Sequence, residues 1–377
     1  MLPLEKLKTL RKNGIKYLLG FEDLFNDYRL YVFRHFSKSI FIIFDHSLTR
    51  KELEHFFLYK VWTGICQLFQ YYLYSVHLFF SSIDSEPDIY TGKSSLLLGF
   101  IYNTVILHEI VEHDVTKIVG CVREPALAHS VILDKEETLF GLSERIVGME
   151  SVIFLAGEML SLRNNFSHQL QGETEISSFY ENCVCICSEL RTSVYIPAIR
   201  NNLQRDNILK LMGKVSWDLK DVVSQHSHYV DHLLDQLYMF SKHMSKLGLD
   251  IPVSKHLQKN IWEIATLVCC LIFVDGFSAA KRCTNEGRAL MQLDFRQFVL
   301  KLEKLSGLKP VPHQQFVTNY IKAYYIPESE LGQWVEQHTE YSAAQLRALV
   351  TTNNNNNNKT KQKLNNLIND LSDRIRR

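Results

Sequence analysis

Residues 107–114 (LHEIVEHD) come closest to a known catalytic pattern in this sequence. A zinc hydrolase helix needs H-E-x-x-H, with two histidines four residues apart and the glutamate as base. Position 112 is glutamate instead, and His108 and His113 would lie about 140° apart around a helix. The inverse pattern, H-x-x-E-H, would need histidine where Glu109 stands. We therefore expect an amphipathic helix with a solvated acidic face, rather than a hydrolase that uses His108 or Glu109.

Residues 224–232 (SQHSHYVDH) place serine, histidine and aspartate close together in sequence. A nucleophile, a base and an orienting carboxylate usually converge from separate elements, so local clustering is weak evidence for catalysis. His226 falls on an apolar helical stripe, which predicts a hydrogen-bonded core histidine. His228, Asp231 and His232 are expected to face solvent.

Cys183, Cys185 and Cys187 form a C-x-C-x-C cluster among eight cysteines. Cys183 and Cys187 share a helical face with Leu190 and Val194, so we expect reduced thiols that act as small core residues rather than metal ligands. GxxxxGK[ST], GxGxxG and GxSxG are all absent from the sequence. Together these patterns predict no catalytic residue, no cofactor and no metal, and Trp217 and Trp334 are expected to be core anchors.

The composition is that of an ordinary globular protein, with 46% hydrophobic and 22% charged residues. Lys+Arg 42 and Asp+Glu 41 leave a formal charge of +1, which gives no support to nucleic-acid binding by a basic surface. Sixteen glycines and eight prolines favour long helices over a turn-rich β-fold. We expect no secretory signal, because no apolar run of roughly 7–15 residues with a small-residue cleavage site follows the basic N-terminus. We expect no membrane span, because the apolar runs fall short of about 20 residues. The expected location is cytoplasmic.

The strongest pattern lies in residues 283–325, which predict a helix, a stop and a second helix. Gly307 can end the first helix, and Pro310 and Pro312 prevent an easy restart. The charged side chains between the apolar positions are expected mostly to face water, with Arg288 and Asp294 as possible surface or buried-pair positions. The apolar stripes that predict the two helices are Met291, Phe295, Phe298, Leu302 and Leu305, and then Phe316, Tyr320 and Ala323.

Other helices are predicted from similar stripes. The spacing of apolar residues predicts one helix of about 32 residues, capped by Ser216 and stopped at Gly248. Ser342 and Gln345 form a capping box before Leu346 and Leu349. The stripe of that long helix is Leu219, Val223, His226, Val230, Leu233, Leu237, Phe240, Met244 and Leu247. Two other helices are predicted by the stripes Leu142, Ile146, Met149, Ile153, Ala156 and Leu160, and Leu257, Ile261, Ile264, Val268 and Leu271.

The fold class predicted from these stripes is all-α, an elongated helical bundle or rod with coiled-coil-like packing. We divide the chain into an aromatic-rich helical region at 1–119, a linker at 120–135 and a regular helical domain at 136–352. Residues 353–377 hold an asparagine run and a short polar, basic tail. Leu364, Ile368, Leu371 and Ile375 could make this tail a short amphipathic helix, which we expect to be solvated rather than in weak contact with acidic lipid.

The amino-acid sequences of three segments resemble those of the syndetin family. NEGRALMQLDF, with the following KLEKL and YIKAYY, is similar to the C-terminal region of that family. ETLFGLSERIVGMESVIFLAGE (137–158) and VSWDLKDVVSQHSHYVDHLL (215–234) resemble its C-terminal domain in the same order, and WTGICQLFQYYLYSVHLFF (62–80) is a fainter match. Members of the family carry a longer region ahead of this domain, through which such complexes are thought to assemble.

The resemblance implies a non-enzymatic subunit of the endosome-associated recycling protein (EARP) vesicle-tethering complex, acting in endocytic recycling and endosomal or retrograde protein transport. Its implied partners are other tethering subunits of the vacuolar-sorting type, SNARE fusion machinery and small GTPases. Peripheral attachment to recycling endosomes or the trans-Golgi network is implied as well. The alternative is a free-standing helical adaptor that binds a membrane or a small GTPase outside the complex. The sequence names no partner-binding residue.

Overall fold

Helices make up all the regular structure in the described part of the chain, so the all-α prediction is confirmed there. The computed structural model describes residues 133, 135–169, 173–251, 253–352 and 358–376, with positions 59, 62–66, 69, 70, 72, 73, 76 and 80. Residues 107–114, nearly all of the predicted linker and most of the asparagine run lie outside these ranges. The chain forms two compact units, Met1–Val194 and Tyr195–Arg377. The predicted domain boundaries stay a prediction.

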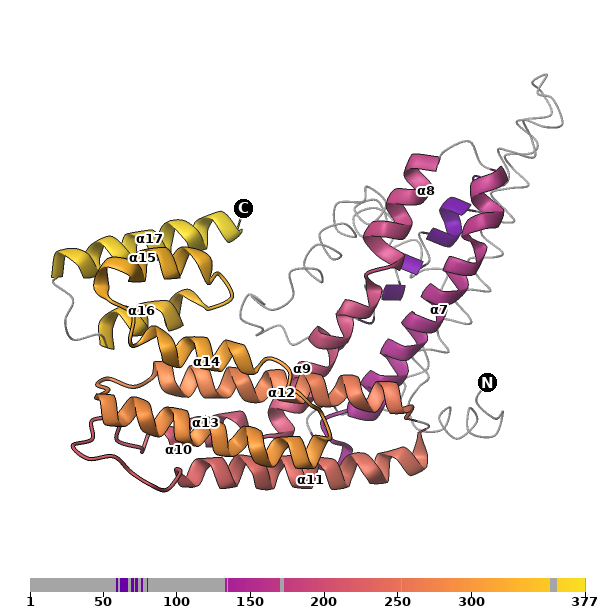
Figure 1. Cartoon of the computed structure of the whole chain (residues 1–377). Coiled ribbons are helices and arrows are strands. Elements are labelled where there is room, and N and C mark those ends of the chain that lie inside the picture. The colour runs from indigo at the N-terminus through magenta and orange to yellow at the C-terminus, as the bar shows by residue number, and fades with distance from the viewer. Residues whose placement is uncertain are drawn as a thin grey trace, which may run out of the picture. The chain divides into compact units, whose positions relative to one another are not determined.

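The first unit is built around one long helix. Its elements are η2 (Glu136–Thr138), α7 (Leu142–Gln169), α8 (Glu173–Phe179), a π-helical turn η3 (Tyr180–Val184), η4 (Cys187–Glu189) and the start of α9 (Leu190–Asn202), of which α7, α8 and α9 are labelled in Figure 1. The predicted α7 stripe is buried at Leu142, Ile146, Met149 and Ala156, whereas Leu160 is exposed. Trp62 packs against the rings of Phe179 and Tyr180, each with a centroid distance of 5.6 Å.

Arg145 ties α7 to two neighbouring chain segments. Its buried guanidinium donates hydrogen bonds to the carbonyl oxygens of Phe80 at 2.5 Å, Val194 at 2.7 Å and Phe140 at 3.3 Å. Burial lowers the pKa of Arg145 to about 10, a value at which it stays cationic at neutral pH. A buried charge is tolerated here because three carbonyl dipoles replace its water.

The C-x-C-x-C segment behaves as the sequence predicts. Cys183 and Cys187 are buried with Leu190 and Val194, while Cys185 is exposed. Burial raises the pKa of both inward-facing thiols, that of Cys187 to about 12, so neither thiol is ionised at neutral pH. The face they share runs through η3, η4 and α9 instead of one continuous α-helix. These two cysteines are therefore packing residues.

The second unit is a bundle centred on α12 (Figure 1). Antiparallel α11 and α12 are fixed by two ring contacts, Tyr229 with Phe273 at 6.0 Å and Phe240 with Trp262 at 6.1 Å. Phe273 also contacts Phe298 of α13 at 4.9 Å. The helices are α10 (Arg205–Met212), α11 (His228–Asp250), α12 (Lys255–Ser278), α13 (Asn285–Ser306), α14 (Gln314–Ala323), α15 (Glu328–Gln337), α16 (Ala343–Thr352) and α17 (Asn358–Arg376).

Helix α12 is apolar on nearly every side because other helices surround it. By length and composition it is the one helix among the described residues that could cross a membrane. Inside the unit, however, 83% of its most apolar window is buried. Helices α10, α11, α13, α14 and α16 supply partners for these faces. Its apolar character is thus accounted for by a core position.

The prediction for residues 283–325 is confirmed. Thr284 caps α13 by accepting the Gly287 N–H at 3.2 Å, and Gly307 ends the helix at φ 72°. Met291, Phe295, Phe298 and Leu302 are buried as their spacing predicts. Helix α14 then begins at Gln314, after the Lys309–Pro310 segment. Local pattern and local stop signals were sufficient here.

The prediction of a single helix from Ser216 to Gly248 is wrong. Helix α11 begins only at His228, and residues 213–227 form an irregular segment. Trp217 and Leu219 are held by hydrogen bonds to Thr284, and the Ser227 N–H by Asp294. These hydrogen bonds to residues more than 60 positions away compete with the backbone hydrogen bonds that a continuous helix would form. Val230, Leu233, Leu237, Phe240 and Met244, on the part that is helical, are buried as predicted.

The expectation of a solvated C-terminal tail is also wrong. Residues 358–376 form α17, which packs against α15 and α16. Leu364 and Ile368 are buried, with Ile368 only 1% exposed. The amphipathic spacing was recognised in the sequence, but the surface that covers it is formed by helices elsewhere in the chain. The tail belongs to the core of the second unit.

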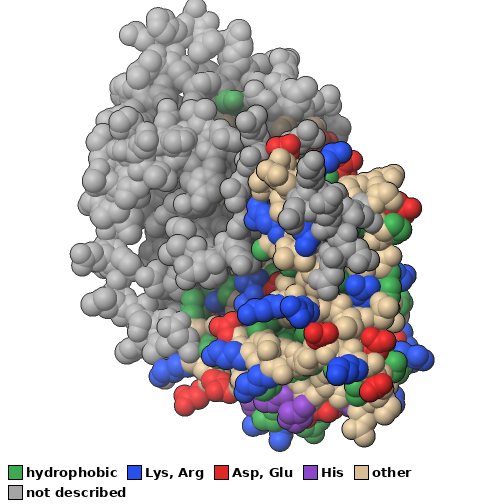
Figure 2. All heavy atoms as spheres, turned by 90° about the vertical axis from the view of Figure 1, so that its left-hand side faces the viewer, with side chains coloured by type: hydrophobic (Ala, Val, Ile, Leu, Met, Phe, Trp, Pro, Cys, Tyr) green, Lys and Arg blue, Asp and Glu red, His purple; other side chains and the backbone are tan. Residues whose placement is uncertain are grey.

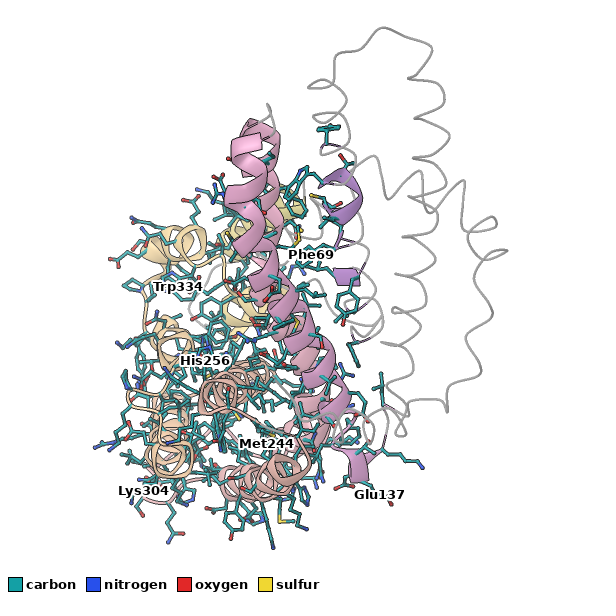
Figure 3. The ribbon with its side chains drawn as sticks, turned by 90° about the vertical axis from the view of Figure 1, so that its right-hand side faces the viewer. Phe69, Glu137, Met244, His256, Lys304 and Trp334 are labelled. Atoms are coloured by element: carbon teal, nitrogen blue, oxygen red, sulfur yellow. The ribbon has the colours of Figure 1, made fainter. Side chains whose placement is uncertain are left out.

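The surface of the second unit carries both signs of charge. Figure 2 shows lysine and arginine side chains interspersed with acidic ones over the visible described surface, in agreement with the formal charge of +1. Histidines gather near its lower edge, and Lys304 lies at an outer edge of the bundle in Figure 3. Any electrostatic recognition must therefore come from a local arrangement of charges.

Candidate functional site

The start of α11 brings together part of the predicted Ser-His-Asp cluster. The His226 Nε2 lies 3.0 Å from both carboxylate oxygens of Asp231, and the Lys301 Nζ donates to Asp231 Oδ1 at 2.8 Å. Hydrogen bonds from Lys301 and His226 lower the pKa of Asp231. His226 is half-buried rather than in the core, and Ser224 is exposed and contributes no bond to it. The group is therefore an ion-pair cluster that ties α11 to α13.

Asp294 is the buried acid that positions this cluster. Its side chain is 0% exposed, and its Oδ1 accepts the Ser227 N–H at 2.7 Å. Burial raises the pKa of Asp294, and the hydrogen bond from the Ser227 N–H opposes that rise. Ser227 is the residue before α11, so Asp294 satisfies a backbone donor that the helix itself leaves unpaired. The sequence left Asp294 open as a surface or buried-pair position, and the structure makes it a buried cap.

Thr284 connects the irregular segment 213–227 to the start of α13. Its N–H donates to the Trp217 carbonyl at 3.0 Å, and its hydroxyl accepts the Leu219 N–H at 3.1 Å. Gly287 packs against the backbone of the same irregular segment. A Cβ at position 287 would lie 1.9 Å from the Trp217 carbonyl oxygen. Only a glycine allows this approach. Trp217 itself is buried against Phe277, as predicted for a core anchor.

Between its anchors at Leu219 and Ser227, the irregular segment presents apolar side chains to solvent. Val222 is 74% exposed, and Val223 is exposed to a lesser degree. Val223 had been predicted to lie in a buried helical stripe. The segment is a candidate contact surface, although its flanking Lys220 and Asp221 give it no net charge.

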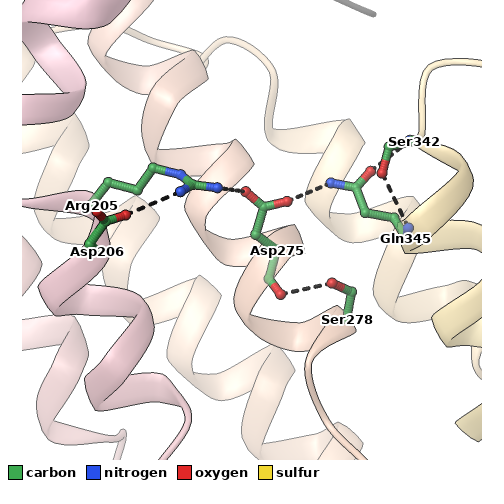
Figure 4. Close-up of polar contacts among 6 residues, drawn as sticks. All are labelled: Arg205, Asp206, Asp275, Ser278, Ser342 and Gln345. Carbon is green, nitrogen blue, oxygen red and sulfur yellow. Dashed lines mark hydrogen bonds and ion pairs between the residues drawn. The ribbon is translucent and has the colours of Figure 1, made fainter. Parts of the chain in front are cut away.

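A second polar network joins three helices of the second unit (Figure 4). The Asp275 carboxylate of α12 accepts hydrogen bonds from Arg205 of α10 at 2.9 Å and from Gln345 of α16 at 2.8 Å. Gln345 also completes the predicted capping box: its Oε1 accepts the Ser342 N–H at 2.9 Å, and its own N–H donates to Ser342 Oγ at 3.2 Å. The local capping motif was predictable, but the bond to Asp275 was not.

Arg288 is a half-buried side chain with aromatic rather than acidic neighbours. Its guanidinium carbon lies 5.7 Å from the Tyr324 ring centroid and 5.1 Å from that of Tyr325. Cation–π contacts of this kind stabilise a desolvated guanidinium. The sequence pattern gave no sign of this arrangement beyond the presence of the two tyrosines near the end of α14. Arg288 thus has a packing role.

Trp334 departs from its predicted role as a core anchor. It is partly exposed and stacks on His338 with ring centroids 4.2 Å apart, and Tyr341 lies 5.5 Å from it. The Tyr341 hydroxyl donates to the Phe316 carbonyl at 2.6 Å. This aromatic stack packs α14, α15 and the chain before α16 against one another.

Among the described residues, no group of three or more histidine, cysteine, aspartate or glutamate side chains could hold a metal ion. The polar clusters found there join helices and cap them, although Asp294 Oδ2 and the Tyr229 hydroxyl are buried without a hydrogen-bond partner among the described residues.

Comparison with known proteins agrees with the resemblance noted in the sequence. A family described as "Syndetin, C-terminal" matches residues 139–369. Three similar relatives are named Syndetin: from Gallus gallus at 35% identity, from Rattus norvegicus at 36% and from Mus musculus at 35%, each over 319 residues and 81% of this chain. The chain spans about a third of the length of these curated relatives, 34% of the first and 33% of the others.

Proposed function

This chain belongs to the syndetin family, and from that membership we propose that it is a non-enzymatic subunit of a vesicle-tethering complex. The proposed setting is the EARP complex, in endocytic recycling and endosomal or retrograde protein transport. The observation that supports this most strongly is the family match over residues 139–369, which takes in the ordered helices of both units up to α17.

The proposed partners are other tethering subunits of the vacuolar-sorting type, with SNARE proteins and small GTPases as further contacts. Binding would come from exposed apolar positions surrounded by polar side chains, as in other helical interfaces. The proposed location is cytoplasmic and peripheral on recycling endosomes, and on the trans-Golgi network. The all-α scaffold and its polar clusters, which join and cap helices, support a binding role over a catalytic one.

Immunoprecipitation of the tagged full chain from cells that express the tethering subunits tests the proposal. We expect tethering subunits to be recovered at physiological salt, and Gly287→Val to abolish recovery by disrupting the packing against Trp217. Gly332→Ala is the matched control, because its Cβ would meet only the Leu364 side chain at an ordinary 3.6 Å.

Recovery of no tethering subunit from the wild-type chain, across salt and detergent conditions, would refute the proposal. Recovery of a small GTPase or membrane without any tethering subunit would instead favour the free-standing adaptor.

A further inference from the structure

Helices α11 and α13 lie side by side on the outside of the second unit (Figure 1), and the outer face of each carries basic and apolar residues. We propose that these faces form a binding surface for anionic membrane lipid. The surface, called here the α11–α13 surface, consists of Tyr238, Met239, Lys242 and Lys246 of α11 and Arg296, Leu300 and Lys304 of α13. The proposal rests on the peripheral membrane association proposed above and assigns it to specific residues.

The two helices run in the same direction and share one exposed side. Both are antiparallel to α12, which Phe240 and Phe298 contact from α11 and α13 respectively. The Asp231–Lys301 pair, 2.8 Å apart, joins the two helices directly. Positions on each helix opposite the α12-facing rings therefore point away from the bundle on the same side.

Each helix carries a row of residues at four-residue spacing with one apolar and two basic members. On α11 the row is Tyr238, Lys242 and Lys246, and on α13 it is Arg296, Leu300 and Lys304. Residues four apart lie above one another on a helix, so each row forms a continuous stripe. Both stripes fall on the side opposite the core.

The apolar members of the α11–α13 surface are exposed to water. Tyr238 is 60% exposed, Met239 is 43% exposed and Leu300 is 47% exposed. Tyr238 and Met239 are consecutive on α11 and precede Lys242, while Leu300 lies between Arg296 and Lys304 in the row on α13. Single aromatic and aliphatic side chains between lysines are the pattern found where a helix lies in a bilayer interface.

The basic members are not neutralised within the described part of the chain. Lys242, Lys246, Arg296 and Lys304 are exposed, and none forms an ion pair with a described carboxylate. Two acids on this side are paired, Asp231 with Lys301 and Glu303 with Lys309 at 3.9 Å, whereas Asp235, one turn before Tyr238, is exposed and offsets one of the four basic charges. The local charge is positive although the whole chain is near neutral.

A lipid surface fits this composition better than a protein partner. Lysine is depleted in the centres of protein–protein interfaces, whereas four of the seven residues here are basic and three of those are lysines. Lysine stems can lie along a membrane with the ammonium groups at the phosphates, and each contributes separately to binding anionic lipid.

Vesicle flotation of the full chain tests the proposal. We expect binding to phosphatidylcholine vesicles in which a third of the lipid is phosphatidylserine, weak binding to pure phosphatidylcholine, and release at high salt, since the Debye length falls to about 3 Å at 1 M. Lys242→Glu/Lys246→Glu/Lys304→Glu should lower partitioning by about 100-fold or more, at roughly fivefold for each charge removed.

The matched control is Lys281→Glu/Arg282→Glu/Lys322→Glu, which makes the same change of charge at exposed positions outside the α11–α13 surface. It should lower partitioning by less than about tenfold, the remaining effect being long-range. Absence of wild-type binding to anionic vesicles, or equal losses in both triple variants, would overturn the proposal. Circular dichroism checks that both remain folded.

A separate readout keeps this proposal distinct from tethering itself. The Lys242→Glu/Lys246→Glu/Lys304→Glu chain should still recover tethering subunits in immunoprecipitation. If it loses those subunits while still binding anionic vesicles, the surface is a protein interface and the lipid assignment is wrong. If wild-type chain binds anionic vesicles but recovers no subunit, the tethering proposal fails and the lipid assignment stands.

Discussion

Alanine at Gly287 should destabilise the second unit, although glycine-to-alanine changes inside helices usually stabilise by up to about 1 kcal/mol. The added Cβ would lie 1.9 Å from the Trp217 carbonyl oxygen, so this carbonyl must move by about 1.5 Å to reach an ordinary contact. Overpacking of this kind costs about 1–3 kcal/mol. The displaced carbonyl also loses its bond from the Thr284 N–H, worth about 0.5–1.5 kcal/mol. After subtracting the gain in helix propensity, the net loss is about 1–3 kcal/mol.

Urea unfolding followed by circular dichroism measures this loss, with Gly248→Ala as the matched control in the same unit. Gly248 lies in α11 and a Cβ there would meet nothing within 4 Å, so this substitution should be neutral or slightly stabilising. Opposite signs for the two variants are the expected result. A Gly287→Ala chain as stable as Gly248→Ala would refute the argument that close backbone approach fixes this position.

Three further outcomes follow from the packing of the second unit. Gln345→Ala removes the capping box and the bond to Asp275, and should lower the unfolding free energy by about 1.5–4 kcal/mol in urea titration, against no change if that network is incidental. Ile368→Ala in α17 should cost about 2–5 kcal/mol, while Asn366→Ala on its exposed face should cost little; equal effects would contradict packing of this helix. Because the pKa of Asp231 is lowered in the folded state, its contribution is present above the ordinary value of 3.8 and is lost as pH falls through the lower folded value. The stability difference between wild type and Asp231→Asn, a few tenths to 1 kcal/mol for so exposed a pair, should therefore be constant near neutral pH and vanish in acid; a difference that grows below pH 3.8 would contradict this.

Local features of the second unit were predictable because their causes lie within a few residues. The 4, 3 spacing of Met291, Phe295, Phe298 and Leu302 places them on one face regardless of what covers that face. Gly307 stops α13 by its own backbone freedom. The amino-acid sequence of residues 283–325 also resembled the family to which the comparison with known proteins assigns the chain.

The start of α11 was not predictable, because its cause lies far along the chain. Apolar spacing continues upstream of His228, and residues 216–227 could satisfy it as a helix. Bonds from Thr284 and Asp294 to segment 213–227 decide otherwise. Periodicity predicts which residues would share a face if the chain were helical. It does not indicate which distant side chains form hydrogen bonds with the same backbone groups.

The sequence by itself determined the all-α class and most helix faces, because these depend on the spacing of apolar residues. It also determined the helix stops, which depend on glycine and proline, and the family, which depends on sequence similarity. Only the tertiary structure decided that Asp294 is buried, that α17 is packed and that two basic-apolar rows meet on the α11–α13 surface. Each of these depends on groups from different helices coming within a few ångströms. That distance is set by the packing of the whole unit.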